Sequence, residues 1–136
     1  MVSKTLEDGG EVFDELVGVP VSQIILIGLV RLNFGDGRDY ELSIERDFLV
    51  RTNEHPEGVV VEFRPYCSGW SPTGMNELVS LFHSVVERAS ASPKALLQID
   101  FADGKSLEVQ PDPQYEGWNF WIAGVRYGQI AGGGLG

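Results

Sequence analysis

The sequence has few of the residues on which covalent cross-links and transition-metal sites depend. Of its 136 residues, one is a cysteine, Cys67, and two are histidines, His55 and His83. A single cysteine excludes an internal disulfide bond, and these three side chains lack the regular spacing of a structural zinc site. We therefore expect a protein of a reducing compartment that holds no metal and no other cofactor.

Positive charge and long apolar runs are also scarce. Ten Lys and Arg stand against twenty Asp and Glu, a net charge of −10, and the basic residues form no patch. Because phosphate backbones are bound mainly by clustered Lys and Arg, nucleic acid is not an expected partner. No apolar run reaches the roughly 18 residues of a membrane span, and the start of the chain lacks a signal-peptide core. The sequence predicts a cytoplasmic protein without membrane contact, and it favours a basic protein as partner.

One short pattern, in contrast, is present twice. LNFGDGRDYELSI begins at Leu32 and IDFADGKSLEVQP begins at Ile99. In each copy an Asp-Gly pair separates two runs of alternating apolar and polar residues, which is typical of a β-hairpin. Since side chains alternate along a strand, the apolar residues of each hairpin share one face. We expect the two apolar faces to build one common core.

The rest of the chain predicts further short strands and one helix. Seventeen glycines imply many turns, and β-branched runs predict strands over 19–29, 48–51, 59–63, 85–91, 115–122 and 124–130. Apolar residues at helical spacing predict one short helix near 74–83. We therefore expect an α+β fold: an antiparallel sheet or partly open barrel of about eight strands from two related β-hairpin halves, with the helix packed on it.

Composition divides the chain into three parts. Residues 1–15 carry five acidic side chains and are expected to form a polar N-terminal arm. Residues 16–130 are expected to form a single domain that contains the internal repeat at 29–44 and 96–111. The glycine-rich residues 131–136 are expected to form a flexible tail.

The second copy of the repeat continues into a longer motif. The stretch FADGKSLEVQPDPQYEGW, residues 101–118, resembles a family of small uncharacterised bacterial proteins with the pattern F-A-D-G-x-x-L-x-V-x-P-D-P-x-Y-E-x-W. The similarity extends over residues 16–130. The resemblance implies a domain of unknown function, and the genomic neighbourhood of some members implies an immunity-like role beside secreted toxins.

The most site-like residues lie at the end of this motif. The cluster combines two carboxylates with large rings beside a proline turn, and its members are Asp112, Tyr115, Glu116, Trp118 and Trp121. As a recognition surface it would offer aromatic anchors and acceptors to a basic partner or a cationic ligand. As scaffold, Asp112 would instead accept hydrogen bonds at the turn while Tyr115 and Trp118 cover the core. Trp70, in the irregular stretch SGWSPTG, is the second candidate contact.

No convergent catalytic set is visible in the sequence. Cys67 and His83 are the one pair that resembles a nucleophile and a base, and their spacing does not establish a shared geometry. The Asp-Gly pairs lack the dense oxygen ligands of a calcium loop. We therefore expect a non-enzymatic binding module, an immunity-like protein that binds a basic, toxin-like protein as a monomer or homodimer. The alternative is a small-ligand-binding or hydrolytic domain that uses a cleft lined by Asp112, Glu116 and Trp118.

Overall fold

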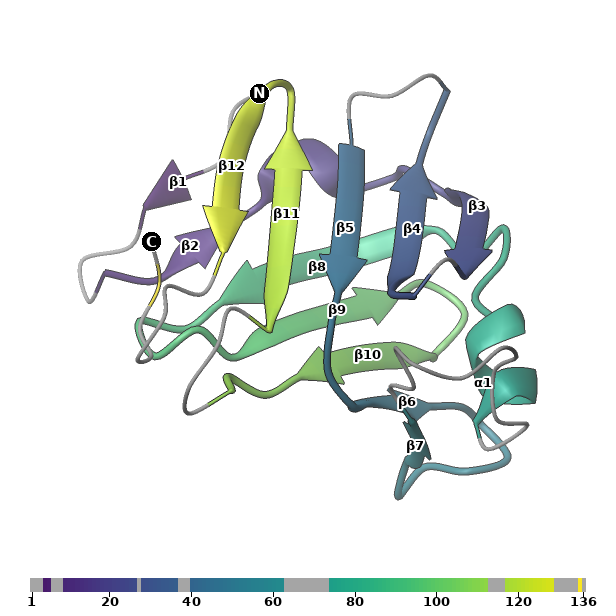
Figure 1. Cartoon of the computed structure of the whole chain (residues 1–136). Coiled ribbons are helices and arrows are strands. Elements are labelled where there is room, and N and C mark those ends of the chain that lie inside the picture. The colour runs from purple at the N-terminus through teal and green to yellow at the C-terminus, as the bar shows by residue number, and fades with distance from the viewer. Residues whose placement is uncertain are drawn as a thin grey trace.

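The fold consists of two antiparallel β-sheets that face each other across one core, with one short helix at the end of the sandwich (Figure 1). The computed structural model describes residues 4–5, 9–26, 28–36, 40–62, 74–112, 117–128 and 135. Within these ranges, no helix is both long and apolar enough to cross a membrane.

The smaller sheet has five strands in the order β12-β11-β5-β4-β3. Its strands are β3 (Val21–Leu26), β4 (Val30–Phe34), β5 (Tyr40–Ile44), β11 (Trp118–Ile122) and β12 (Val125–Gly128). The larger sheet has seven strands in the order β1-β2-β8-β9-β10-β6-β7. Its strands are β1 (Lys4–Thr5), β2 (Glu11–Val12), β6 (Phe48–Arg51), β7 (Val59–Val61), β8 (Val86–Ala91), β9 (Leu97–Phe101) and β10 (Ser106–Val109).

The two predicted hairpins are present, one in each sheet. β4 and β5 pair with Phe34 opposite Tyr40, and β9 and β10 pair with Asp100 opposite Ser106. Their alternating apolar side chains point inward and are fully or almost fully buried. These are Leu32, Phe34, Leu42, Ile44, Ile99, Phe101, Leu107 and Val109. All eight belong to a single apolar cluster, so the prediction of a common core is confirmed.

The strands are antiparallel, as predicted, but the alternative of a partly open barrel is wrong, because the two sheets do not close into a barrel. The five-stranded sheet ends at β3 and β12, and the seven-stranded sheet ends at β1 and β7. One isolated bridge between Pro20 and Val85 joins them at a single corner. Over the described residues the fold is mostly antiparallel β with one short α-helix, and it has twelve short strands where about eight were expected.

The helix is also shorter than predicted. α1 spans Met75–Val79, and the chain then continues through tighter turns, in which the N–H groups of Leu81 and Phe82 donate three residues back. At His83 the backbone takes a φ of 70°, which is incompatible with helix. Its N–H donates to the carbonyl of Val21 at 2.8 Å, and this bond turns the chain toward β8.

The N-terminal segment differs from the arm that its composition suggests. It supplies β1, β2 and the 3₁₀ turn η1 (Asp14–Leu16). Phe13 is fully buried, and its ring lies 5.6 Å from that of Phe120 and 5.1 Å from that of Tyr127. The acidic composition of this stretch suggests a polar arm, but its apolar residues complete the core. At the other end, Leu135 donates its N–H to the carbonyl of Pro93 at 3.1 Å.

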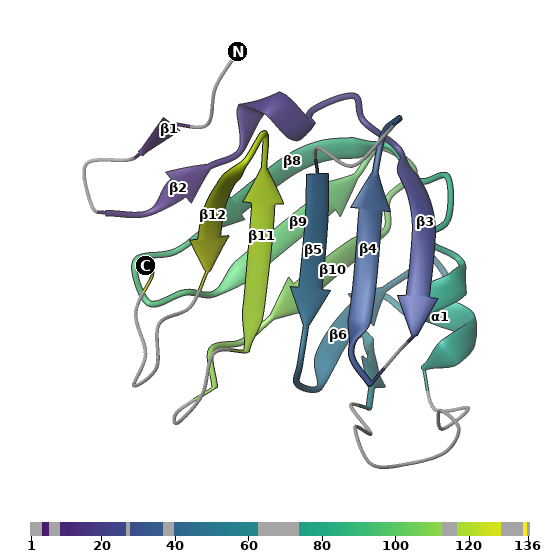
Figure 2. The ribbon, with the colours of Figure 1, turned by 45° about the horizontal axis from the view of Figure 1, so that its top comes forward.

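Each sheet includes one hairpin whose preceding strands in the sequence belong to the other sheet. The β6–β7 hairpin follows β5 but pairs with β10, and the β11–β12 hairpin follows β10 but pairs with β5. Figure 2 shows β5 leaving its sheet at the lower end and continuing into β6. The two connections touch: Glu45 donates its N–H to Gly117 at 2.9 Å, and Arg46 donates a guanidinium N–H to Pro111 at 2.7 Å. We call this arrangement the hairpin exchange.

Candidate functional site

The two described tryptophans of the predicted cluster do not share one surface. Trp118 and Trp121 lie three residues apart on β11, so their side chains point to opposite faces of the sheet. Trp118 is fully buried and donates its indole N–H to the carbonyl of Ala95 at 2.8 Å. Trp121 is 43% exposed and stands opposite Glu41 on one neighbouring strand and Arg126 on the other. Trp118 is therefore part of the core, whereas Trp121 is accessible.

The other members of the predicted site are less informative. Asp112 is half-buried and already takes part in an interaction within the protein. Tyr115, Glu116 and Trp70 lie outside the described residues, as does Cys67. Among the described members, Trp118 and Trp121 point to opposite faces of β11 and so do not line a common cleft.

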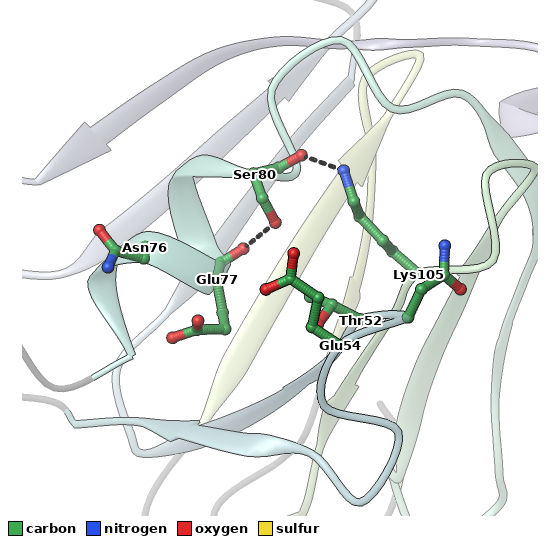
Figure 3. Close-up of a pocket in the computed structure, with 7 residues that line it drawn as sticks. Thr52, Glu54, Asn76, Glu77, Ser80 and Lys105 are labelled. Atoms are coloured by element: carbon green, nitrogen blue, oxygen red, sulfur yellow. Dashed lines mark hydrogen bonds between the residues drawn. The ribbon is translucent and has the colours of Figure 1, made fainter.

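A polar pocket of about 330 Å³ lies elsewhere, between α1, the loop that joins β6 to β7, and the turn that joins β9 to β10. Its lining residues are Thr52, Asn53, Glu54, Asn76, Glu77, Ser80 and Lys105. Figure 3 shows Glu54 on the loop, Glu77 on the helix and Lys105 on the turn, with the Lys105 side chain directed toward Ser80. Three segments distant in sequence therefore form the walls. We call this the α1 pocket.

The loop wall is held by short-range hydrogen bonds. The N–H of His55 lies 3.1 Å from the hydroxyl oxygen of Thr52, and the N–H of Thr52 donates to the carbonyl of His55 at 3.3 Å. Asn53 reaches across to the neighbouring turn, where its side-chain amide donates to the carbonyl of Asp103 at 3.3 Å. These contacts fix Glu54, which is exposed, at the mouth of the pocket.

The one cation of the pocket is already engaged. The ammonium group of Lys105 donates to the carbonyl of Ser80 at 2.7 Å and lies 3.4 Å from a carboxylate oxygen of Asp103. The Ser80 hydroxyl in turn donates to the carbonyl of Glu77 at 2.6 Å. Lys105 thus ties the β9–β10 turn to the end of the helix, and the carboxylates of Glu54 and Glu77 dominate the charge of the pocket.

Asp103 is the anchor of this turn. Its partial burial by itself raises its pKa, but the hydroxyl of Ser84, 2.7 Å away, the backbone N–H of Lys105, and the Lys105 charge together lower the pKa below its ordinary value. Ser84 is 5% exposed and is the one buried polar residue in the described part of the chain. A buried hydroxyl needs a hydrogen-bond partner, so this contact matters for stability.

This network predicts a pH-dependent contribution of Asp103 to stability. We expect Asp103→Asn to lower the free energy of unfolding at pH 7 by a few tenths to about 1 kcal/mol, a small loss because partly exposed charges are screened. A carboxylate whose pKa is lower in the folded state than in the unfolded state stabilises the fold at pH values above the unfolded-state pKa of about 3.9. This stabilisation is lost as the pH falls through the folded-state pKa. Urea denaturation at pH 7 and pH 3 should show the difference from wild type shrinking at the lower pH. An unchanged difference would show that the Asp103 charge does not stabilise the fold.

The lining of the α1 pocket is suited to a cationic side chain. Two carboxylates with amide and hydroxyl groups can accept the several N–H donors of an Arg or Lys side chain. In the described ranges, no group of three or more His, Cys, Asp or Glu side chains is close enough to hold a metal ion. The chemistry that this geometry supports is recognition of positive charge.

Little in the sequence predicts this pocket. Lys105 is noticeable as the basic residue that follows the repeated Asp-Gly turn, with Arg38 at the matching place in the first copy. Nothing in the local pattern places Glu54 near Glu77, because their proximity depends on where the β6–β7 hairpin pairs.

Comparison with known proteins identifies a family whose activity is not known. The sequence pattern described as "Family of unknown function (DUF6188)" matches residues 12–134. No curated protein and no solved structure matches the chain at a significant level.

Proposed function

The chain belongs to the DUF6188 family of unknown function, and we propose that it is a non-enzymatic binding module that recognises a basic protein. The α1 pocket receives a Lys or Arg side chain of that partner. The net charge of −10 favours encounter with a positively charged surface, because long-range attraction raises association rates.

One observation carries this proposal. Glu54 and Glu77 line the same pocket from two different walls, while the ammonium of Lys105 is directed to Ser80 and Asp103. An incoming guanidinium or ammonium therefore meets the carboxylates of Glu54 and Glu77. Recognition by charge-assisted hydrogen bonds of this kind is stronger than between neutral groups.

A peptide titration followed by NMR tests the proposal. We expect a six-arginine peptide to shift the backbone amide signals of residues around Glu54 and Glu77, and Glu54→Gln with Glu77→Gln to weaken its binding about three- to tenfold. The loss should shrink as salt is raised, since exposed charges are screened.

The matched control removes the same charge elsewhere. Glu45→Gln with Glu87→Gln changes two exposed carboxylates outside the pocket. If that variant loses as much affinity as the pocket variant, binding reflects net charge alone and the α1 pocket is not the site.

The immunity-like role is the biological form of this proposal. The partner would be a toxin-like bacterial protein whose basic surface the chain covers, and a toxin gene directly beside its own gene would support it. The alternative of a small-ligand or hydrolytic cleft is less well supported, because Trp118 is fully buried and cannot line an open cleft.

We also infer that the scaffold consists of two related halves, β3–β7 and β8–β12. In each half the first three strands lie side by side in the same order, and the last two form the hairpin that moves to the other sheet. The repeated hairpins occupy the same place in both halves. The α1 pocket lies where the second repeated turn meets the exchanged β6–β7 hairpin, so this arrangement positions Lys105 beside Glu54.

A further inference from the structure

The end of α1 and the turn after it carry apolar side chains that are exposed and not part of the core. Val79 is 55% exposed, Phe82 is 46% exposed and Val85 is 37% exposed. They lie within seven residues of the chain, at the end of α1 and in the turn that leads into β8. We call them the Phe82 patch.

The patch is held in a fixed shape. The ring of His83, which is also exposed, stacks on the ring of Phe82 with their centroids 3.9 Å apart. His83 has a left-handed backbone, fixed by its N–H bond to Val21, and Ser84 donates its N–H to the carbonyl of Leu81 at 3.0 Å. A non-glycine residue in this conformation is costly and persists because its surroundings hold it. The exposed aromatic pair is therefore ordered before any partner arrives, which lowers the entropic cost of binding.

The patch and the pocket lie on adjacent faces of the same helical segment. Leu78 and Leu81 are buried against the sheets, whereas Asn76, Glu77 and Ser80 line the pocket. Val79 and Phe82 are three residues apart and share the remaining exposed side. The apolar patch and one wall of the acidic pocket thus belong to the same short segment of the chain.

We infer that the Phe82 patch is the apolar half of the binding surface, and that its occupant is a basic segment with an apolar residue next to Lys or Arg. This inference rests on the proposed function of the α1 pocket. Charge decides between a foreign partner and a second copy of the chain. Two copies, each with a net charge of −10, would repel each other. A cationic segment gains attraction at the pocket and buries its apolar side chain on Val79 and Phe82.

Two peptides of equal charge test the inference on the full chain. We expect the peptide RRLLRR to bind about five- to thirtyfold more tightly than RRSSRR, as measured by NMR titration, because only the first can bury apolar surface on the patch. Phe82→Ala should remove most of that preference and leave the affinity for RRSSRR unchanged. Glu54→Gln with Glu77→Gln should weaken both peptides.

A control variant keeps the test specific. Trp121→Ala removes an aromatic side chain of similar exposure, 43%, from the outer face of the five-stranded sheet, and it should retain the full preference for RRLLRR. Thermal melts of both variants should stay close to wild type, since both side chains are largely exposed. Equal binding of the two peptides, or a preference that survives Phe82→Ala, would overturn the inference and leave the pocket proposal intact. Failure of both peptides to bind would overturn the proposed function and this inference with it.

Discussion

Trp118→Ala should lower the free energy of unfolding by about 3–5 kcal/mol, the usual cost of deleting a large ring from a packed core. Trp118 is fully buried, and its indole N–H satisfies the carbonyl of Ala95, a residue with a φ of 65°. The substitution leaves both a cavity and an unpaired buried carbonyl. Urea denaturation followed by circular dichroism measures the loss.

The same strand supplies the control. Trp121→Ala should cost less than about 1 kcal/mol, because surface substitutions away from special features change stability little. If Trp118→Ala does not fold, Trp118→Phe retains part of the ring volume and should show an intermediate loss. Equal losses for Trp118→Ala and Trp121→Ala would contradict the buried position of Trp118.

Gly74→Ala should have the second largest effect, a loss of about 2–4 kcal/mol that combines a left-handed backbone with overpacking. Gly74 has a φ of 75° and precedes α1, where the chain crosses β7. An added Cβ would lie 2.6 Å from the carbonyl oxygen of Val60 and 2.8 Å from the Cα of Val61. Because both atoms belong to the backbone of an ordered strand, neither can move aside cheaply.

Gly124→Ala separates the two causes. Gly124 has a φ of 85°, and no atom of the described chain lies within 4 Å of the Cβ it would gain. Its substitution carries the conformational cost alone, about 1–2 kcal/mol. The two variants should differ by roughly 1–3 kcal/mol in chemical denaturation. Identical losses would show that the chain at Gly74 does not pass so close to β7.

The sequence predicts what depends on neighbouring residues. Alternation and an Asp-Gly pair are enough to predict both repeated hairpins and their buried faces. The same rule of alternation separates Trp118 from Trp121, although their shared aromatic character suggests a single cluster. Phe13 is missed because its neighbours are acidic, while its burial depends on β11 and β12.

The sequence does not predict what depends on pairing between distant strands. The β6–β7 hairpin has the same local pattern whether it pairs with β5 or with β10. Its actual place beside β10 brings Glu54 toward the turn that carries Lys105. The barrel prediction fails for a related reason, because closure depends on how sheet edges meet and not on the content of any one strand.

The hairpin exchange also has a consequence for how the chain reaches its native state. Neither the first nor the second half of the sequence can complete a sheet with its own strands, so both must be present before the common core is covered. Pairings such as Leu107 with Val50 and Phe120 with Leu42 join residues more than 50 positions apart. A high share of long-range contacts slows folding, since loop closure must precede the gain from pairing. We therefore expect the chain to fold slowly and in one cooperative step. Two fragments produced by cutting the chain between β7 and α1 should acquire structure only when they are mixed.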